Sequence, residues 1–141
     1  MTESPSSNAP QTAPVKGSAV PYITVGGALA AAQLYRRAFD ATIASAYPPD
    51  AQGRTMHVHL YINGSSVMLS DAFPEHGHAL QTPAGFSVVL MVTDVDAWHR
   101  RAVEAGLVST MAPTDMFWGD RYAALRDTYG VVWGLNGPQV K

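Results

Sequence analysis

The sequence contains no cysteine among its 141 residues. This absence excludes disulfide bonds, thiolate-bound zinc and a cysteine nucleophile. Long hydrophobic runs are also missing, so no segment is expected to span a bilayer. Charged residues make up only 14% of the chain, and the formal net charge is −2. A clustered positive surface is therefore not expected, which argues against nucleic acid or an anionic membrane as the main partner.

The first 17 residues differ in composition from the rest of the chain. Ser, Pro, Thr and Ala dominate them, so residues 1–17 are predicted to be a disordered tail. No basic segment followed by an apolar stretch is seen at the start, so we expect no signal peptide and a cytoplasmic location. Hydrophobic residues make up 47% of the chain, which suffices for a core, and residues 18–141 are expected to form the folded domain.

The first part of this domain shows a strand, a helix and three further strands. Hydrophobic spacing and β-branched runs predict a strand at residues 21–25, a helix at 28–40 and strands at 42–47, 55–62 and 66–70. Residues 55–62 alternate between apolar and polar side chains, which is typical of a strand with one buried face. The Asn63-Gly64 pair predicts a tight hairpin turn after this strand.

The same order recurs after a loop at residues 72–85. The predicted elements are a strand at 86–92, a helix from Asp94 to Gly106, and strands at 107–111, 122–126 and 131–135, with a loop at 113–120. Thr93-x-x-Asp96 resembles a helix capping box with Asp in place of Glu. One such module is too small to bury its sheet well, so we expect two βαβββ modules that share a core and leave a concave face for a ligand.

Four stretches resemble the PhnB-like branch of the glyoxalase/bleomycin resistance protein/dioxygenase (vicinal oxygen chelate) superfamily. They are VMLSDAF at 67–73, VTDVDAWHRRAVEAG at 92–106, FWGDRYAALRDTYG at 117–130 and VVWGL at 131–135. The resemblance covers roughly residues 18–136. It implies an α+β fold of two βαβββ modules, about residues 18–73 and 85–137, whose mixed curved sheets carry helices on their outer faces. It also implies a bacterial homodimer, often with modules exchanged between chains.

The resemblance implies a metal site that can be tested residue by residue. Superfamily members usually place ligands for one divalent metal on the first and last strand of each module. The corresponding candidates are Tyr22 or Thr24, Ser70 or Asp71, Ser87, and Gly134. One carboxylate and no histidine is a poor donor set for zinc, nickel or iron. We therefore expect no metal cofactor. A non-standard site would use His57, His59 and Asp71.

His57-Val-His59 is the sharpest local signal in the sequence. Alternate residues of a strand point to the same face, so His57, His59 and Tyr61 are expected to face the concave pocket while their apolar neighbours pack on the helix. The histidines could orient a ligand, act as general bases near neutral pH or hold a displaced metal. The alternative is that they only form hydrogen bonds on an open sheet face.

A second candidate group lies in the predicted loop before the strand at 122–126. Trp118 offers a stacking plane, and the adjacent Asp120 and Arg121 could fix a polar ligand. Alternatively, these two charges form structural ion pairs with Arg126 or Asp127. Glu75-His76-Gly77-His78 lies in a Gly/Pro-rich loop and does not by itself predict a metal site.

Three functions are left open by the sequence. The candidate ligand-binding residues share an expected position in the pocket or at its edge, and they are His57, His59, Tyr61, Tyr22, Trp118, Asp120, Arg121 and Trp133. The first function is metal-free binding of a small molecule, which the aromatic face favours. The second is a metal-dependent lyase, isomerase or dioxygenase with a non-standard ligand set. The third is a non-catalytic structural dimer. We favour the first and assign no catalytic residue.

Overall fold

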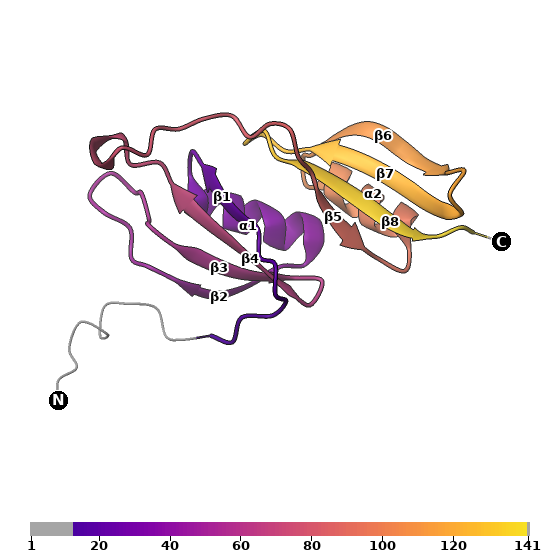
Figure 1. Ribbon diagram of the computed structural model, residues 1–141, viewed down its shortest axis with the longest axis horizontal. Coiled ribbons are helices and arrows are strands. Elements are labelled where there is room, and N and C mark those ends of the chain that lie inside the picture. Colours follow the sequence, from indigo (N-terminus) through magenta and orange to yellow (C-terminus); the bar gives the residue numbers. More distant parts are fainter. Residues whose placement is uncertain (1–12, 141) are drawn as a thin grey trace. The chain divides into compact units, whose positions relative to one another are not determined.

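The computed structural model describes residues 13–140, which form two four-stranded sheets and two α-helices (Figure 1). The elements are β1 (Tyr22–Val25), α1 (Ala28–Phe39), β2 (Thr42–Ala46), β3 (Val58–Ile62), β4 (Ser65–Asp71), the 3-10 helix η2 (Pro74–His76), β5 (Val88–Met91), α2 (Val95–Glu104), β6 (Val108–Asp115), β7 (Asp120–Arg126) and β8 (Val132–Pro138). This order confirms the predicted α+β fold of two βαβββ modules.

The two sheets have the same topology. The first has the strand order β1-β4-β3-β2 and the second the order β5-β8-β7-β6. In each sheet the first strand runs parallel to the last one, and the other neighbours are antiparallel. The chain divides into two compact units, which we describe separately. Unit 1 runs up to Arg36 and continues over Ala41–Gln81, and unit 2 comprises Arg37–Asp40 and the chain from Thr82 onward.

β3 shows the alternation predicted from the sequence. Val58, Leu60 and Ile62 are fully buried on one face of the strand. Met56 departs from the pattern and is 56% exposed, because the strand begins at Val58 and not at residue 55. The sequence alternation therefore identifies the buried face correctly but overestimates the length of the strand.

Asp71, at the end of β4, connects the first sheet to α1. Its Oδ1 accepts hydrogen bonds from the backbone N–H of Gly27, at 2.7 Å, and of Ala28, at 3.2 Å. Its Oδ2 accepts a hydrogen bond from the N–H of Thr55 at 2.9 Å. A carboxylate is well suited to the unpaired N–H groups and positive dipole of a helix N-terminus. Because Asp71 shares its strand face with Leu69, α1 covers the apolar face of this sheet.

In unit 2, α2 packs against β6, β7 and β8. Asp94 caps this helix by accepting a hydrogen bond from the N–H of Ala97 at 3.0 Å, so the cap lies one residue later than the expected Thr93. The predicted loop at 113–120 is also corrected. β6 extends to Asp115, and a short turn at 116–119 leads into β7.

The N-terminal segment next to unit 1 differs from the expected disordered tail. Residues 1–12 lie outside the described residues, whereas Pro14 and Lys16 are bonded to the first sheet. The N–H of Ser66 donates to the carbonyl of Lys16 at 2.9 Å, and the Tyr61 hydroxyl donates to the carbonyl of Pro14 at 2.6 Å. The segment lies beside β4 ahead of β1, so backbone pairing orders residues that composition alone assigns to the tail.

Within residues 13–140, no helix is long and apolar enough to cross a membrane.

We predict that Asp71→Ala lowers the free energy of unfolding by about 2–3 kcal/mol, because three backbone N–H groups lose a charged acceptor. The matched variant Asp94→Ala removes one exposed capping bond and is expected to cost about 1 kcal/mol. Urea denaturation followed by circular dichroism measures both values. Equal losses in the two variants would contradict the proposed role of Asp71.

Candidate ligand site on the first sheet

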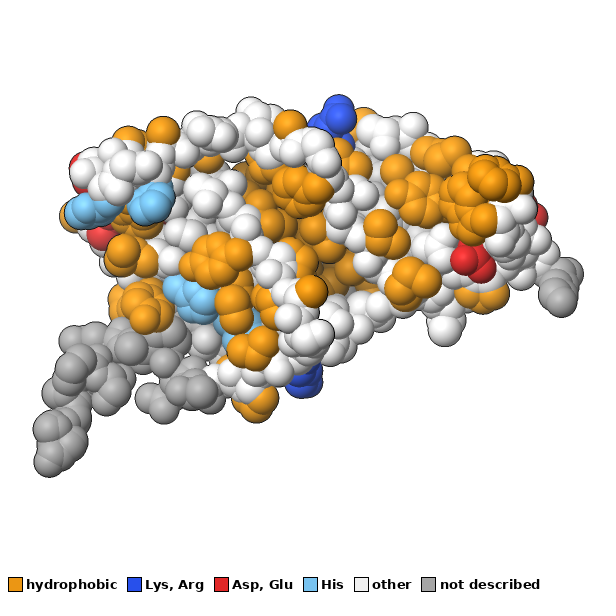
Figure 2. Space-filling model, in the orientation of Figure 1, with side chains coloured by type: hydrophobic (Ala, Val, Ile, Leu, Met, Phe, Trp, Pro, Cys, Tyr) orange, Lys and Arg blue, Asp and Glu red, His pale blue; other side chains and the backbone are white. Residues whose placement is uncertain are grey.

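The face of the first sheet opposite α1 carries half of the candidate residues. The side chains on this open face include Tyr22 and Thr24 from β1, His59 and Tyr61 from β3, and Ser66, Met68 and Ser70 from β4. On the surface formed by unit 1, Figure 2 shows pale-blue histidine side chains among orange hydrophobic ones. The open face thus combines imidazole, aromatic and small polar groups.

His57 lies directly before β3 and is held by two tyrosines. Its Nδ1 is 3.0 Å from the Tyr22 hydroxyl oxygen, and that hydroxyl also donates to the Met56 carbonyl at 3.2 Å. The Tyr47 ring meets the imidazole edge-on, with 5.9 Å between the ring centroids. Within the described part of the chain, Nε2 of His57 makes no hydrogen bond. The half-buried ring is therefore fixed through Nδ1 and offers Nε2 to a ligand.

The His57–Tyr22 pair is uncharged near neutral pH. Burial lowers the pKa of His57, and the nearby His59 lowers it further. Burial raises the pKa of the Tyr22 hydroxyl, with an added contribution from Tyr47. A neutral imidazole of this kind can accept a proton or form a hydrogen bond with a ligand.

His59 has a different environment, although it shares the open face. It is only 3% exposed, and its Nε2 lies 2.7 Å from Oγ of Ser66. The backbone N–H of Lys16 donates to the same oxygen at 2.8 Å, and the Lys16 ammonium lies 4.1 Å from the centroid of the Tyr61 ring. The N-terminal segment thus covers this end of the face. The structure brings His57 and Tyr22 together, but it engages His59 and Tyr61 in structural hydrogen bonds.

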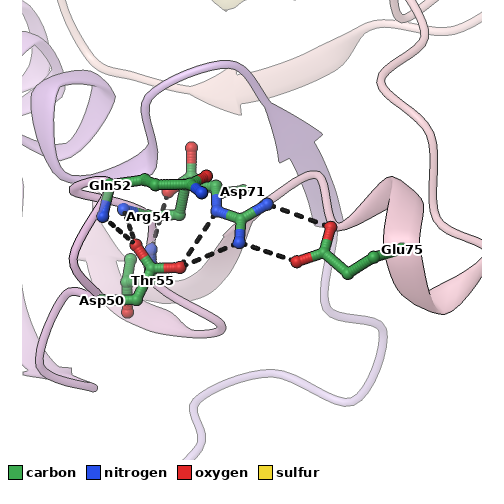
Figure 3. A network of polar contacts seen from close by, with 6 residues as sticks. All are labelled: Asp50, Gln52, Arg54, Thr55, Asp71 and Glu75. Carbon is green, nitrogen blue, oxygen red and sulfur yellow. Dashed lines mark hydrogen bonds and ion pairs between the residues drawn. The ribbon is translucent and has the colours of Figure 1, made fainter.

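A cavity of about 280 Å³ adjoins the His57 cluster, which consists of His57, Tyr22 and Tyr47. Its lining comes from the segment between β2 and β3 and from the residues after β4, namely Tyr47, Pro48, Asp50, Arg54, Met56, Phe73, Glu75 and His76. Figure 3 shows Arg54 between the two carboxylates of the cavity. Sequence reasoning missed Tyr47 and Met56, which line this cavity. The sequence pattern assigns both positions to strands, whereas β2 ends at Ala46 and β3 begins at Val58.

In unit 2, Asp120 and Arg121 are already paired within the fold. The Arg121 guanidinium bonds both oxygens of Asp96, at 2.9 and 3.0 Å, and one oxygen of Asp115 at 3.0 Å. Asp120 accepts a hydrogen bond from the Asn136 side chain at 2.9 Å. The expected partners Arg126 and Asp127 are therefore replaced by residues from α2, β6 and β8.

Trp118 and Trp133, the two tryptophans of the candidate set, have opposite environments. Trp118 is exposed in the turn between β6 and β7, with its ring centroid 6.2 Å from that of Tyr122. Trp133 is 0% exposed, and its Nε1 donates to Asp127 at 2.9 Å. The register of β8 places Trp133 with Leu135 in the core and turns Gly134 to the opposite face of the second sheet. Trp133 is thus a core residue that a ligand cannot reach, which corrects the expected position.

The positions expected to hold a divalent metal do not fit one. Ser70 and Ser87 provide neither an imidazole nor a carboxylate, and Asp71 points to α1. A Cβ added at Gly134 would lie 2.5 Å from the Tyr122 hydroxyl, so the Tyr122 side chain fills the space of the missing ligand. Among the described residues, no group of three or more His, Asp or Glu side chains is placed to hold a metal.

Comparisons with known proteins agree with this architecture. The model of the Glyoxalase/Bleomycin resistance protein/Dioxygenase superfamily matches residues 17–135. Uncharacterized protein Mb0911c from Mycobacterium bovis is 39% identical over 125 residues, covering 84% of this chain and 81% of that protein. The structure of PA1353 from Pseudomonas aeruginosa is 25% identical with a TM-score of 0.70, covering 86% of this chain and 98% of that one. A PhnB protein from Bacillus cereus, described as a putative 3-demethylubiquinone-9 3-methyltransferase, shares the fold at 20% identity and a TM-score of 0.64, over 84% and 98% of the two chains.

We predict that the protein loses stability as the pH falls from about 7.5 to about 5.5. Burial lowers the pKa values of His57 and His59 in the folded state. The unfolded chain therefore takes up protons first as the pH falls through about 6.5, and the free energy of unfolding decreases. Glu75 does not contribute in this window, because Arg54 lowers its pKa to about 2.

Urea denaturation at the two pH values measures this decrease. His59→Gln keeps a polar group near Ser66 but removes a titrating imidazole, so it should make the decrease smaller. An identical decrease in the variant and in the original protein would show that His59 is not one of the groups responsible.

Proposed function

The chain belongs to the glyoxalase/bleomycin resistance protein/dioxygenase superfamily, and from this premise we propose that it binds a small organic molecule without a divalent metal. The observation that carries the proposal is the His57 cluster on the open face of the first sheet. Its imidazole is neutral, half-buried and fixed by Tyr22, with Nε2 unbonded within the described residues. Ligand sites combine apolar walls with a few placed polar groups, and this cluster has that composition.

The tautomer of His57 determines which ligand group Nε2 recognises. The Tyr22 hydroxyl has one proton, which it donates to the Met56 carbonyl. In that arrangement Nδ1 of His57 carries the ring proton and donates to Tyr22, so Nε2 is an acceptor. The site therefore favours a ligand that presents an N–H or O–H donor to Nε2, with its apolar part against the rings of Tyr22 and Tyr47. This proposal assigns no catalytic residue.

The homodimer implied by the resemblance is part of the same proposal, and light scattering coupled to gel filtration measures the molecular mass in solution.

A ligand found in a screen can be recognised because it raises the melting temperature of the protein. We predict that binding of such a ligand requires His57 and does not require a metal. His57→Ala should weaken its binding about tenfold, which corresponds to one lost hydrogen bond, while changing the unfolding free energy little. The matched control is His78→Ala, which removes an exposed imidazole outside the cluster. Calorimetric titrations are made with and without EDTA, alongside metal analysis of untagged protein purified without chelators.

Loss of the melting-temperature shift on adding EDTA, together with a near-stoichiometric metal, would favour the metal-dependent enzyme over this proposal. Equal binding by His57→Ala and the original protein would remove His57 from the site.

A further inference from the structure

The cavity beside His57 has a charge pattern that the open face lacks. Arg54 supplies one positive charge, while Asp50 and Glu75 supply two negative charges. Arg54 lowers the pKa of Glu75 to about 2, and hydrogen bonds from Arg54 and Gln52 lower the pKa of Asp50. Both carboxylates therefore stay ionised at neutral pH. The three groups together carry one net negative charge at the cavity wall.

Arg54 is not available to bind an anionic ligand. Its Nε donates to Asp50 at 3.0 Å, and its two terminal nitrogens donate to the two oxygens of Glu75 at 3.1 and 2.7 Å. The centre of the guanidinium also lies 4.5 Å from the centroid of the Phe73 ring. An anion would have to break the paired bonds with Glu75 and would meet the net negative charge. A cation meets neither obstacle.

The remaining wall of the cavity is formed by apolar and aromatic side chains and by the imidazole of His76. Tyr47, Pro48, Met56 and Phe73 line it, and both Tyr47 and Met56 are well exposed. A tyrosine ring attracts a cation through its face, and methionine adapts to ligands of irregular shape. The volume of about 280 Å³ lies near the lower end for small-molecule sites, so a compact ligand fits best.

We propose that this cavity binds a small organic cation, with its apolar or aromatic part against Tyr47 and Met56 and its ammonium group beside Asp50 and Glu75. The proposal rests on the proposed function, because Tyr47 borders both the cavity and His57. The inference specifies, beyond the proposed function, that the ligand is positively charged. An ammonium N–H also matches Nε2 of His57 as a hydrogen-bond acceptor.

The test uses three probes of similar size that differ in charge, namely benzylammonium, benzyl alcohol and phenylacetate. Titration followed by backbone-amide NMR shifts gives the affinity and locates the perturbed residues. We expect benzylammonium to bind most tightly, to shift residues of the cavity and to lose affinity as the ionic strength rises. Phenylacetate is expected to bind most weakly.

Glu75→Gln should weaken benzylammonium binding about two- to fivefold, since one exposed ion-pair partner is lost. The same change removes the cavity's net charge, so phenylacetate should bind better to the variant than to the original protein. Glu104→Gln, an identical change at an exposed position of α2, should leave both affinities unaltered.

Benzyl alcohol binding as tightly as benzylammonium, tighter binding of phenylacetate, or an equal effect of Glu104→Gln would overturn the inference. If no probe binds while a screened ligand still depends on His57, this inference fails and the proposed function stands. If no ligand of any charge stabilises the protein, both fail.

Discussion

Unit 1 depends on a single buried carboxylate. Asp71 joins the end of β4, the first turn of α1 and the segment before β3 through three backbone hydrogen bonds. Buried N–H groups without partners are costly, so the helix start and the segment at Thr55 are held where this side chain can reach them. The same contact fixes which face of the sheet α1 covers. It therefore also fixes which face is left for His57 and Tyr22.

Much of the fold could be predicted from the sequence, because the spacing of hydrophobic residues along the chain indicates most of the helices and strands. The alternation of β3 and the helical spacing of α1 are properties of neighbouring residues, and both were predicted correctly. Trp133 could not be placed in this way. The run VVWGL is apolar or glycine throughout, so it has no polar–apolar alternation, and only pairing with β7 shows which side faces the core.

The candidate site was predictable only in part for a related reason. The pattern His57-Val-His59 identified the open face, but the segment that buries His59 belongs to residues counted as tail. Arg121 bonds to Asp96, which lies 25 positions earlier in the sequence. The cavity around Arg54 forms between two loops. Such contacts depend on tertiary structure, which cannot be predicted from residue types and their local spacing alone.

The close approach of Tyr122 to Gly134 also limits which side chains residue 134 can carry. Introducing a carboxylate at residue 134 by one substitution would place its Cβ 2.5 Å from the tyrosine oxygen, so the variant would be sterically crowded. Shortening Tyr122 first would leave a hole above glycine and lose a ring that packs beside Trp118. Each route passes through a disfavoured intermediate. A carboxylate donor at this position would therefore need concerted changes at residues 134 and 122.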